Sequence, residues 1–505
     1  GGPLTGARLM ADERITNFVK GLSHLDARLG SLVLELPAPA ALPPSQEATA
    51  QQITALVEAS LPVISLPGPH RKAKELIAAK VAAVFGLRLF ALPAADLPAA
   101  AESAELARLW HRETVLSGVG LFLDAQGIDP AEPGADTVRR WVAQSGGLTF
   151  VAVREPWTLP AAVNVDTAKP AAQEQRRAWE SALGAGSGKK AALLAGRFDL
   201  DLDDIAASVG RAGAGGDVWA AALETARPAL DQLAQRVDSK AALSDLKLPA
   251  LQAEQLRRIA GQVRRRSTVL DDFGFAGRLN RGTGLGVLFA GESGTGKTMA
   301  AEALARDLDM MLYRIDLSAV VSKYIGETEK NLRKLFDAAE GGGAVLFFDE
   351  ADALFGKRSE VRDSHDRYAN IEVSYLLQRM ESFRGLAILA TNRRDSLDAA
   401  FLRRLRFVVT FPFPATAERR AIWSAVFPAA TPVDGLSTER LARLNLTGGS
   451  IHNVALNAAY LAANDGGTVT MELLLAAARD EFRKLDRPVN DADFAWSAGE
   501  GRHGH

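Results

Sequence analysis

The stretch GVLFAGESGTGKTMAAEALARDL, residues 286–308, decides the fold of the second half of the chain. The apolar run GVLFA is typical of a buried strand, and MAAEALARDL is rich in residues that favour helices. Between them GESGTGKT fits the pattern G-x-x-x-x-G-K-[ST], in the strand-then-helix context that this pattern requires. The glycines let the backbone curl so that N–H groups point at phosphate oxygens, and the helix N-terminus adds partial positive charge. The stretch therefore predicts a phosphate-binding loop in an α/β fold.

Two neighbouring carboxylates end the apolar strand VLFFDE, about fifty residues after this loop. We expect Lys297 to meet the β and γ phosphates of ATP, and Thr298 and Asp349 to hold Mg²⁺. Glu350 is then placed to polarise the attacking water. A solvated acidic strand end is the alternative interpretation of the pair. Given the phosphate loop, hydrolysis of Mg-ATP is the better prediction.

Three further polar residues follow the strand LAILATN. That strand places Asn392 beside the same phosphates, as an amide that can orient water; the alternative is an Asn that caps a turn. In DAAFLRRLRF, Arg403 and Arg406 follow a short helix and can reach a neighbouring subunit's γ-phosphate, where such arginines supply about 10³ to 10⁵ in rate. Arg404 is interpreted as a solvated or structural residue, with a register shift of one as the open alternative. These arginines would make activity depend on assembly.

Composition limits the class of protein. A chain of 505 residues is long enough for two to four folded units, and 47% hydrophobic with 24% charged residues is typical of a globular protein. The net charge of -2 gives no general attraction for nucleic acid or for an anionic membrane, so we expect neither as a partner. The absence of cysteine and of any apolar run near the roughly 20 residues of a membrane helix predicts a cytoplasmic protein.

The two halves of the chain share one order of elements. Each has apolar strands alternating with helices, followed by a stretch that is helical only. Gapless matching places Lys74 on Lys297, 223 residues later, and LFLD of the first half on LFFD of the second. The residues that match in the helical stretches are Pro170, Glu174, Arg176 and Trp179, on Pro414, Glu418, Arg420 and Trp423. The first half is therefore predicted to be a second copy of the fold, with an unrelated α/β domain as the alternative.

The phosphate loop of this first copy is degenerate. In GPHRKAKE, Arg71 and Ala73 stand where the intact loop has glycines, and their side chains block close approach of the backbone to phosphate. Glu75 stands in place of the threonine and repels phosphate, and Ala125 stands in place of the second carboxylate. We therefore expect no hydrolysis there, and a scaffold or adaptor role.

Together these strings resemble the AAA clade of AAA+ ATPases, over about residues 265–485. The resemblance implies a P-loop AAA+ module, with a parallel-sheet α/β large domain and a helical lid, preceded here by a degenerate AAA-like copy. It also implies ATP and Mg²⁺ as cofactors and a homo-hexameric ring. The runs KYIGETEKNL, FFDEADALFGKRSEV, DRYANIEV, YLLQRM and AFLRRLRFVV resemble more narrowly the ATPases of contractile injection systems, which are phage-tail-like machines. The partner implied is a protein substrate or an injection-system component.

The resemblance also assigns residues. SKYIGETEKNL looks like a pore loop, with Lys323, Tyr324 and Ile325 gripping an extended polypeptide, and residues 356–370 look like a second one. DDFGF stands where relatives contact adenine, and LTGGSIHN resembles the lid segment that covers the nucleotide. The residues expected to contact nucleotide are Gly291, Glu292, Ser293, Gly294, Thr295, Gly296, Lys297, Thr298, Met299, Asp349, Phe273, Gly274, Gly449 and Ser450.

The expected domains are an N-terminal helix and Pro/Ala-rich linker (1–60), a degenerate AAA-like α/β domain (61–169), a helical lid-like domain (170–240), a connecting helix (241–268), the ATPase large domain (269–412), its helical lid (413–490) and a tail (491–505).

Three functions stay open. A remodeller that threads protein through a central pore is the main hypothesis, and an ATP-switched assembly factor or scaffold is its competitor. A nucleic-acid translocase would show hydrolysis stimulated by DNA or RNA, which we do not expect.

Overall fold

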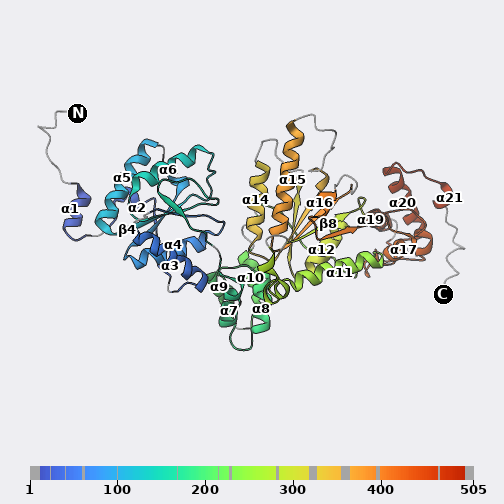
Figure 1. The fold of residues 1–505 in the computed structure, drawn as a ribbon. Helices are drawn as coiled ribbons and strands as arrows, with labels where there is room; N and C mark the ends of the chain where they lie inside the picture. Colours follow the sequence, from blue (N-terminus) through green and yellow to red (C-terminus); the bar gives the residue numbers. More distant parts are fainter. Residues whose placement is uncertain are drawn as a thin grey trace. The chain divides into compact units, whose positions relative to one another are not determined.

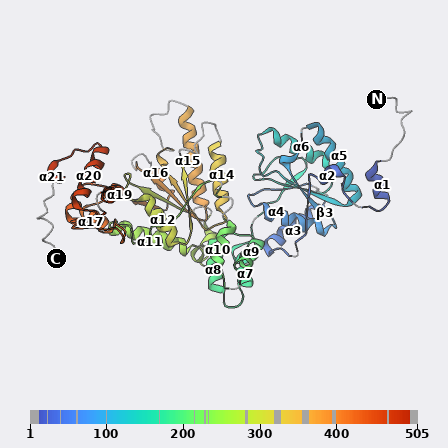
Figure 2. The same cartoon turned by 180° about the vertical axis from the view of Figure 1, so that it is seen from behind.

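The computed structural model describes residues 12–22, 24–39, 41–59, 63–98, 100–167, 169–213, 215–226, 230–231, 233–279, 284–317, 327–353, 364–393, 399–464 and 467–494. The chain divides into two compact units (Figures 1 and 2). The first comprises Gly1–Ala195 and Asp199–Gly213, and the second Gly196–Phe198 and Ala214–His505.

The first unit contains a six-stranded sheet in the order β1-β3-β4-β5-β2-β6. Its strands are β1 (Leu34–Leu36), β2 (Val63–Leu66), β3 (Arg88–Pro93), β4 (Val119–Asp124), β5 (Thr149–Ala152) and β6 (Ala162–Asn164). All pair in parallel except β1, which runs antiparallel to β3 at one edge. Strands β2 and β5 are buried along their whole length, as parallel strands covered on both faces are.

Helices cover both faces of this sheet. One buried cluster packs α3 (Pro44–Glu58) and α4 (Arg71–Val84) on the sheet, and another packs α2 (Ala27–Gly30), α5 (Ala100–Ser117) and α6 (Pro133–Ser145) on it. The helices that follow are α7 (Ala172–Leu183), α8 (Gly188–Arg197) and α9 (Leu202–Ala212).

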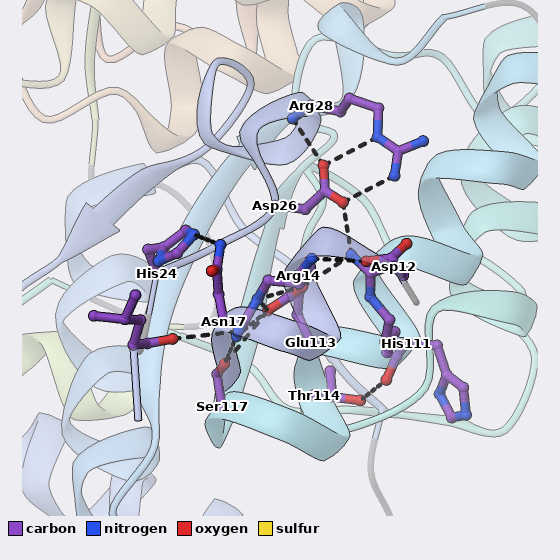
Figure 3. A network of polar contacts seen from close by, with 12 residues as sticks. Asp12, Arg14, Asn17, His24, Asp26, Arg28, His111, Glu113, Thr114 and Ser117 are labelled. Carbon is purple, nitrogen blue, oxygen red and sulfur yellow. Dashed lines mark hydrogen bonds and ion pairs between the residues drawn. The ribbon is translucent and has the colours of Figure 1, made fainter. Parts of the chain in front are cut away.

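Buried ion pairs anchor the first helix, α1 (Glu13–Val19), on α5 (Figure 3). The Arg14 guanidinium lies 2.9 Å from the Glu113 carboxylate, and both side chains are almost fully buried. Asp26 accepts hydrogen bonds from Arg28 and Arg112, at 2.9 and 2.6 Å, which hold its pKa well below the usual range. Because a buried charge without a partner is strongly unfavourable, these pairs specify where the segment docks.

The second unit repeats the same topology. Its sheet has the order β12-β8-β11-β10-β9-β7, so each strand of the first sheet has its counterpart six strands later in the chain. The strands are β7 (Gln235–Val237), β8 (Leu285–Ala290), β9 (Met311–Asp316), β10 (Ala344–Asp349), β11 (Leu386–Thr391) and β12 (Phe407–Thr410). Again only the three-residue edge strand, β7, pairs antiparallel. The predicted fold class is confirmed, and the shared strand order supports its degenerate first copy.

Helices α11 (Ala250–Arg264) and α12 (Lys297–Asp307) pack on one face of this sheet, and α14 (Glu327–Ala339) and α15 (Ser364–Ser382) on the other (Figure 1). The short α16 (Ala399–Leu402) precedes β12. A separate apolar cluster unites the last helices. They are α17 (Thr416–Ala425), α18 (Thr438–Leu441), α19 (Gly448–Asn464), α20 (Met471–Lys484) and α21 (Asp491–Phe494).

Phe198, which follows α8 in the chain, belongs to the second unit and contacts the turn before β10 there. Phe198 forms an isolated antiparallel bridge with Gly342, in the turn before β10, and its ring meets Trp219 of α10 (Val218–Ala226) edge-on at 5.1 Å. Gly342 has φ 88°, and a Cβ on it would overlap the carbonyl oxygen of Arg197. The turn therefore requires glycine at this position.

Three elements lie across the predicted domain boundaries. β1 and α3 lie before residue 61 and belong to the sheet and core of the first unit, and β7 lies before residue 241 and belongs to the second sheet. The Pro-rich run that predicted a linker is partly the first turn of α3, where Pro44 is tolerated because that turn needs no backbone N–H. The predicted boundaries stay predictions.

Candidate active site

The loop between β8 and α12 has the backbone of a phosphate cradle. Gly291, Gly294 and Gly296 have φ of 157°, 79° and 102°, in the region that favours glycine. A Cβ on Gly291 would overlap the carbonyl oxygen of Phe411, and one on Gly294 would lie 2.6 Å from Thr447 Oγ1. Space and backbone conformation both exclude other residues at these two positions. The loop can therefore bring its N–H groups close to an anion.

Lys297, the first residue of α12, is held by three oxygens. Its Nζ donates to the carbonyl oxygens of Gly291 and Glu292, at 2.7 and 3.0 Å, and to Asn392 Oδ1 at 2.8 Å. The side chain is buried, and this burial lowers the pKa of the ammonium, against the opposing effect of Asp349 and Asp352. Two predicted site residues, far apart in the sequence, thus meet in one hydrogen bond.

The carboxylates lie at the same edge, because the parallel strands β8, β10 and β11 all end there. Asp349 ends β10; its Oδ1 accepts from the backbone N of Glu350 at 3.0 Å, and its Oδ2 lies 2.7 Å from the Arg314 guanidinium of β9. Glu350 is exposed and has φ 52°, which turns the chain sharply after the strand. Thr298 is half-buried in the first turn of α12. Oxygen ligands of this kind suit Mg²⁺.

Three polar residues of the site were missed by the sequence analysis. Asp352 accepts a short hydrogen bond from the Thr391 hydroxyl and another, at 3.2 Å, from the backbone N of Asn392. It therefore positions the segment that carries the Asn392 amide. The sequence shows Asp352 only as a third acid in the run DEAD, and this run does not indicate which groups Asp352 contacts. Arg314, the ion-pair partner of Asp349, gave no signal at all.

The lid segment contacts the phosphate loop directly. The backbone N of Gly449 donates to the carbonyl oxygen of Gly294 at 2.9 Å. Ser450 is buried, and its backbone N donates to Thr447 Oγ1 at 3.3 Å. Thr447, also missed, thus caps the start of α19. His452 is exposed on the same helix.

The remaining loop residues divide by exposure. Glu292 and Ser293 are exposed, whereas Thr295 is buried and its hydroxyl donates to the carbonyl oxygen of Glu292 at 2.8 Å. Met299, on α12, is 37% exposed. Neither Lys323, Tyr324 and Ile325 nor residues 356–363 of the second predicted pore loop are among the described residues.

Phe273 and Gly274, for which contact with adenine stays a prediction, lie near the start of β8 and not at the phosphate loop. They follow a π-helical turn, Thr268–Asp272, in which Leu270 lines a cavity with Leu285. Leu285 begins β8, so these residues lie near the end of the strand opposite to the loop that follows Ala290. Leu246 instead approaches the loop, 3.9 Å from a Cβ built on Gly296.

Arg406 lies near the start of β8, away from the phosphate loop that follows this strand. Arg403 and Arg406 are exposed, and the backbone N of Arg406 donates to the carbonyl oxygen of Gly286 at 2.9 Å. From there to Gly291 the strand rises about 17 Å, at roughly 3.3 Å per residue. Arg404 lies 3.9 Å from Glu381 in the same unit.

The corresponding place in the first unit is closed by its own side chains. Helix α4 begins at Arg71, so a helical turn replaces the glycine loop. Arg71 Nε lies 2.7 Å from Glu75 and 3.1 Å from Asp124, which ends β4 as Asp349 ends β10. Lys74 is fully buried; its Nζ donates to Gly68 O and, at 2.8 Å, to Val153 O, and burial lowers its pKa to about 7. The geometry supports the prediction of no hydrolysis here.

Comparison with known families agrees with this site. Residues 287–415 match the model of the ATPase family associated with various cellular activities (AAA). The second half of the chain carries an AAA domain. Residues 171–228 match the model of the contractile injection system ATPase helical domain. The predicted resemblance to AAA+ ATPases of contractile injection systems is confirmed by these two matches.

Individual relatives match part of the chain. The proteasome-activating nucleotidase of Saccharolobus islandicus (strain M.14.25 / Kamchatka #1) is 35% identical over 202 residues, which are 38% of this chain and 51% of the relative. That of Aeropyrum pernix is 33% identical over 212 residues, 40% of this chain and 52% of the relative. Proteasome-activating nucleotidase 2 of Haloferax volcanii is 35% identical over 210 residues, with 40% and 51% covered. The chain spans about half the length of these relatives. In the described part of the chain, no helix has the length and apolarity to cross a bilayer.

Proposed function

We propose that the chain is a ring-forming AAA+ ATPase that hydrolyses Mg-ATP to remodel or thread a protein substrate, in the service of a contractile injection system. The observation that carries the proposal is the meeting of Lys297, Asp349, Glu350 and Asn392 at one sheet edge, beneath a lid bonded to Gly294. The matched AAA domain supports it.

The residues of the site take distinct roles in this proposal. The loop N–H groups and Lys297 bind the phosphates, because the ammonium can exchange its three oxygen partners for phosphate oxygens. Glu350, exposed beside Asp349, accepts the proton of the attacking water, and Asn392 orients that water. Thr298 and Asp349 would hold Mg²⁺, which when bound neutralises charge on the β and γ phosphates. Arg314 keeps the Asp349 carboxylate paired until the ion competes for it.

Assembly completes the site in this proposal. The backbone of Arg406 lies about 17 Å along β8 from the loop of its own chain, and in this proposal Arg403 and Arg406 act on the nucleotide of a neighbouring protomer. A homo-hexamer is the expected ring. Lys323, Tyr324 and Ile325 are proposed to grip substrate in its centre.

A non-threading assembly factor is the second candidate, favoured by the closed site of the first unit, which suits a scaffold. Changing Tyr324 to Ala separates the two. In a threader it abolishes stimulation of ATP hydrolysis by substrate and leaves basal hydrolysis intact. Unchanged remodelling by that variant would leave the assembly factor as the better account.

Glu350→Gln tests the hydrolytic site. We expect the variant to bind ATP with unchanged affinity and to lose about 10²- to 10⁴-fold in kcat, the usual contribution of a positioned base. Phosphate release and binding of a fluorescent ATP analogue measure the two. The control is Glu472→Gln, an exposed acid on α20, which should behave as wild type. Normal turnover by Glu350→Gln would contradict its role.

A further inference from the structure

An arginine-rich cavity lies at the amino ends of the strands of the second sheet. It has a volume of about 690 Å³, and the arginines that line it are Arg197, Arg258, Arg265, Arg266, Arg384 and Arg406. No acidic residue is among its described lining. These six arginines come from the end of α8, from α11 and the turn after it, and from the chain before β11 and β12.

Three of these arginines have no carboxylate partner among the residues that the structure describes. The Arg197 guanidinium contacts Met310 Sδ at 3.3 Å, and burial lowers its pKa to about 10. Arg265 and Arg406 are exposed, and no described acid lies within ion-pair distance of either. By contrast Arg258 pairs with Glu254 at 3.1 Å. Asp309 acts electrostatically on Arg197, and Asp271 on Arg266 and Arg384, but these two acids are outnumbered by the six arginines. The remaining positive charge favours an anion from outside the chain.

The volume of the cavity and its apolar lining residues indicate which kind of anion the cavity can bind. A volume of about 690 Å³ lies in the range of small-molecule sites and suits a ligand smaller than a protein segment. The apolar side chains of Leu270, Leu285, Met310 and Phe407 line it beside the arginines. The guanidinium fork matches phosphate oxygens in pairs, which a lysine cannot do. A ligand with several phosphates joined to an apolar or aromatic group would match both the arginines and the apolar residues that line the cavity.

We propose that this cavity is a second ligand site, which binds a small polyphosphate such as a nucleotide, separately from the phosphate loop. Arg406 belongs both to the cavity and to the pair proposed to act on a neighbouring protomer, so an occupant competes for that arginine. This consequence for hydrolysis rests on the proposed function, whereas binding itself does not.

Calorimetry with the full chain tests the site, using inorganic tripolyphosphate and ADP as probes. Lys297→Ala serves as the background, so that the phosphate loop contributes little. We expect about one tripolyphosphate per chain, with an affinity that falls as salt rises. Adding Arg197→Ala or Arg265→Ala should weaken binding about tenfold or more, since each removes a charge-assisted hydrogen bond. If ADP binds more tightly than pyrophosphate, which lacks a base, the apolar residues that line the cavity would be identified as the site of the base.

The matched control is Arg257→Ala on the same helix, because Arg257 pairs with Glu254 and lines a different cavity. It should leave the affinity unchanged. Arg265→Ala alters an exposed side chain, so it keeps the test valid should Arg197→Ala unfold. Absence of binding, equal affinity in all variants, or binding of short polyglutamate but not of tripolyphosphate would each overturn the proposal. Failure of wild-type protein to bind Mg-ATP would instead count against the phosphate loop alone.

Discussion

Lys74 and Lys297 occupy corresponding places in two copies of one fold, six residues after the first glycine of each loop. Lys297 donates a hydrogen bond to the side-chain amide of Asn392 beside the glycine loop. Lys74 instead is buried and donates to two backbone carbonyl oxygens. The same residue type thus serves a ligand site in one copy and the core in the other. Burial, more than sequence position, separates the two roles.

Lys74→Met should remove a pH dependence of stability. The folded pKa of about 7 lies below the unfolded value of about 10.4, so the unfolded chain binds more protons between these values and stability rises with pH. We expect wild type to gain about 2 kcal/mol in the unfolding free energy of the first unit between pH 7.5 and 9.0, and Lys74→Met to gain almost none. Urea unfolding followed by tryptophan fluorescence measures this. Lys72→Met, an exposed change on α4, should keep the wild-type slope; a slope retained by Lys74→Met would contradict the assignment.

Asp352→Ala should lower turnover without changing nucleotide affinity. Asp352 holds the Thr391 hydroxyl and the Asn392 backbone N, so its loss frees the amide that orients water. We expect about a tenfold fall in kcat, less than for loss of the base itself. Asp352→Asn keeps an acceptor oxygen and should recover part of the loss. Steady-state hydrolysis with a separate binding assay is the measurement, and equal losses in both variants would point to a different role.

The site was predictable where its chemistry lies in a short run. Gly291 to Thr298, Asp349 with Glu350, and Asn392 each follow an apolar strand, and parallel strands end together, so spacing alone predicts their meeting. Asp352, Arg314 and Thr447 act through contacts between separate segments, which no local pattern reveals.

At the scale of elements, a joint within the second unit holds Phe198 and α10 at the turn before β10. The Phe198 bridge to Gly342 and the Trp219 indole, which donates to the carbonyl oxygen of Asp309 at 2.9 Å, hold this joint. The joint lies just before β10 and Asp349 lies at the end of β10, so the length of this strand separates the joint from the carboxylates.

Gly342→Ala should break this joint. Its Cβ would overlap the Arg197 carbonyl, and φ 88° is strained for alanine, so we expect destabilisation of about 1 to 3 kcal/mol. Gly341→Ala is the matched control, since its Cβ would meet only the Ala226 Cβ at 3.4 Å. Thermal unfolding and hydrogen exchange of α10 measure the difference. Equal stability of the two variants would show that the bridge is not needed.

The elements themselves were largely predictable, because long periodic helices and buried strands have strong patterns. The exceptions were the edge strands β1 and β7, of three residues each, whose pairing depends on a partner strand far along the chain. The start of α3 was lost because a proline run resembles a linker.

At the scale of the whole molecule, activity should depend on contact between protomers. A chain with both Arg403 and Arg406 changed to Ala has an intact phosphate loop, and a chain with Lys297→Ala has intact arginines. Mixing the two should restore a fraction of wild-type hydrolysis, because some interfaces then combine one good loop with one good arginine pair. Phosphate release across mixing ratios is the measurement. No recovery at any ratio would argue that the arginines do not act across the interface.

The ion pair of Arg71 with Asp124 gives the two halves of the chain different sensitivities to cellular energy supply. A unit whose anion pocket is filled by its own guanidinium has no free-energy contribution that varies with nucleotide concentration. The AAA unit gains about 2.7 kcal/mol when ligand exceeds its dissociation constant a hundredfold, and loses this when ATP is depleted. Depletion of ATP would therefore lower the free energy of unfolding of the AAA unit and leave that of the first unit unchanged.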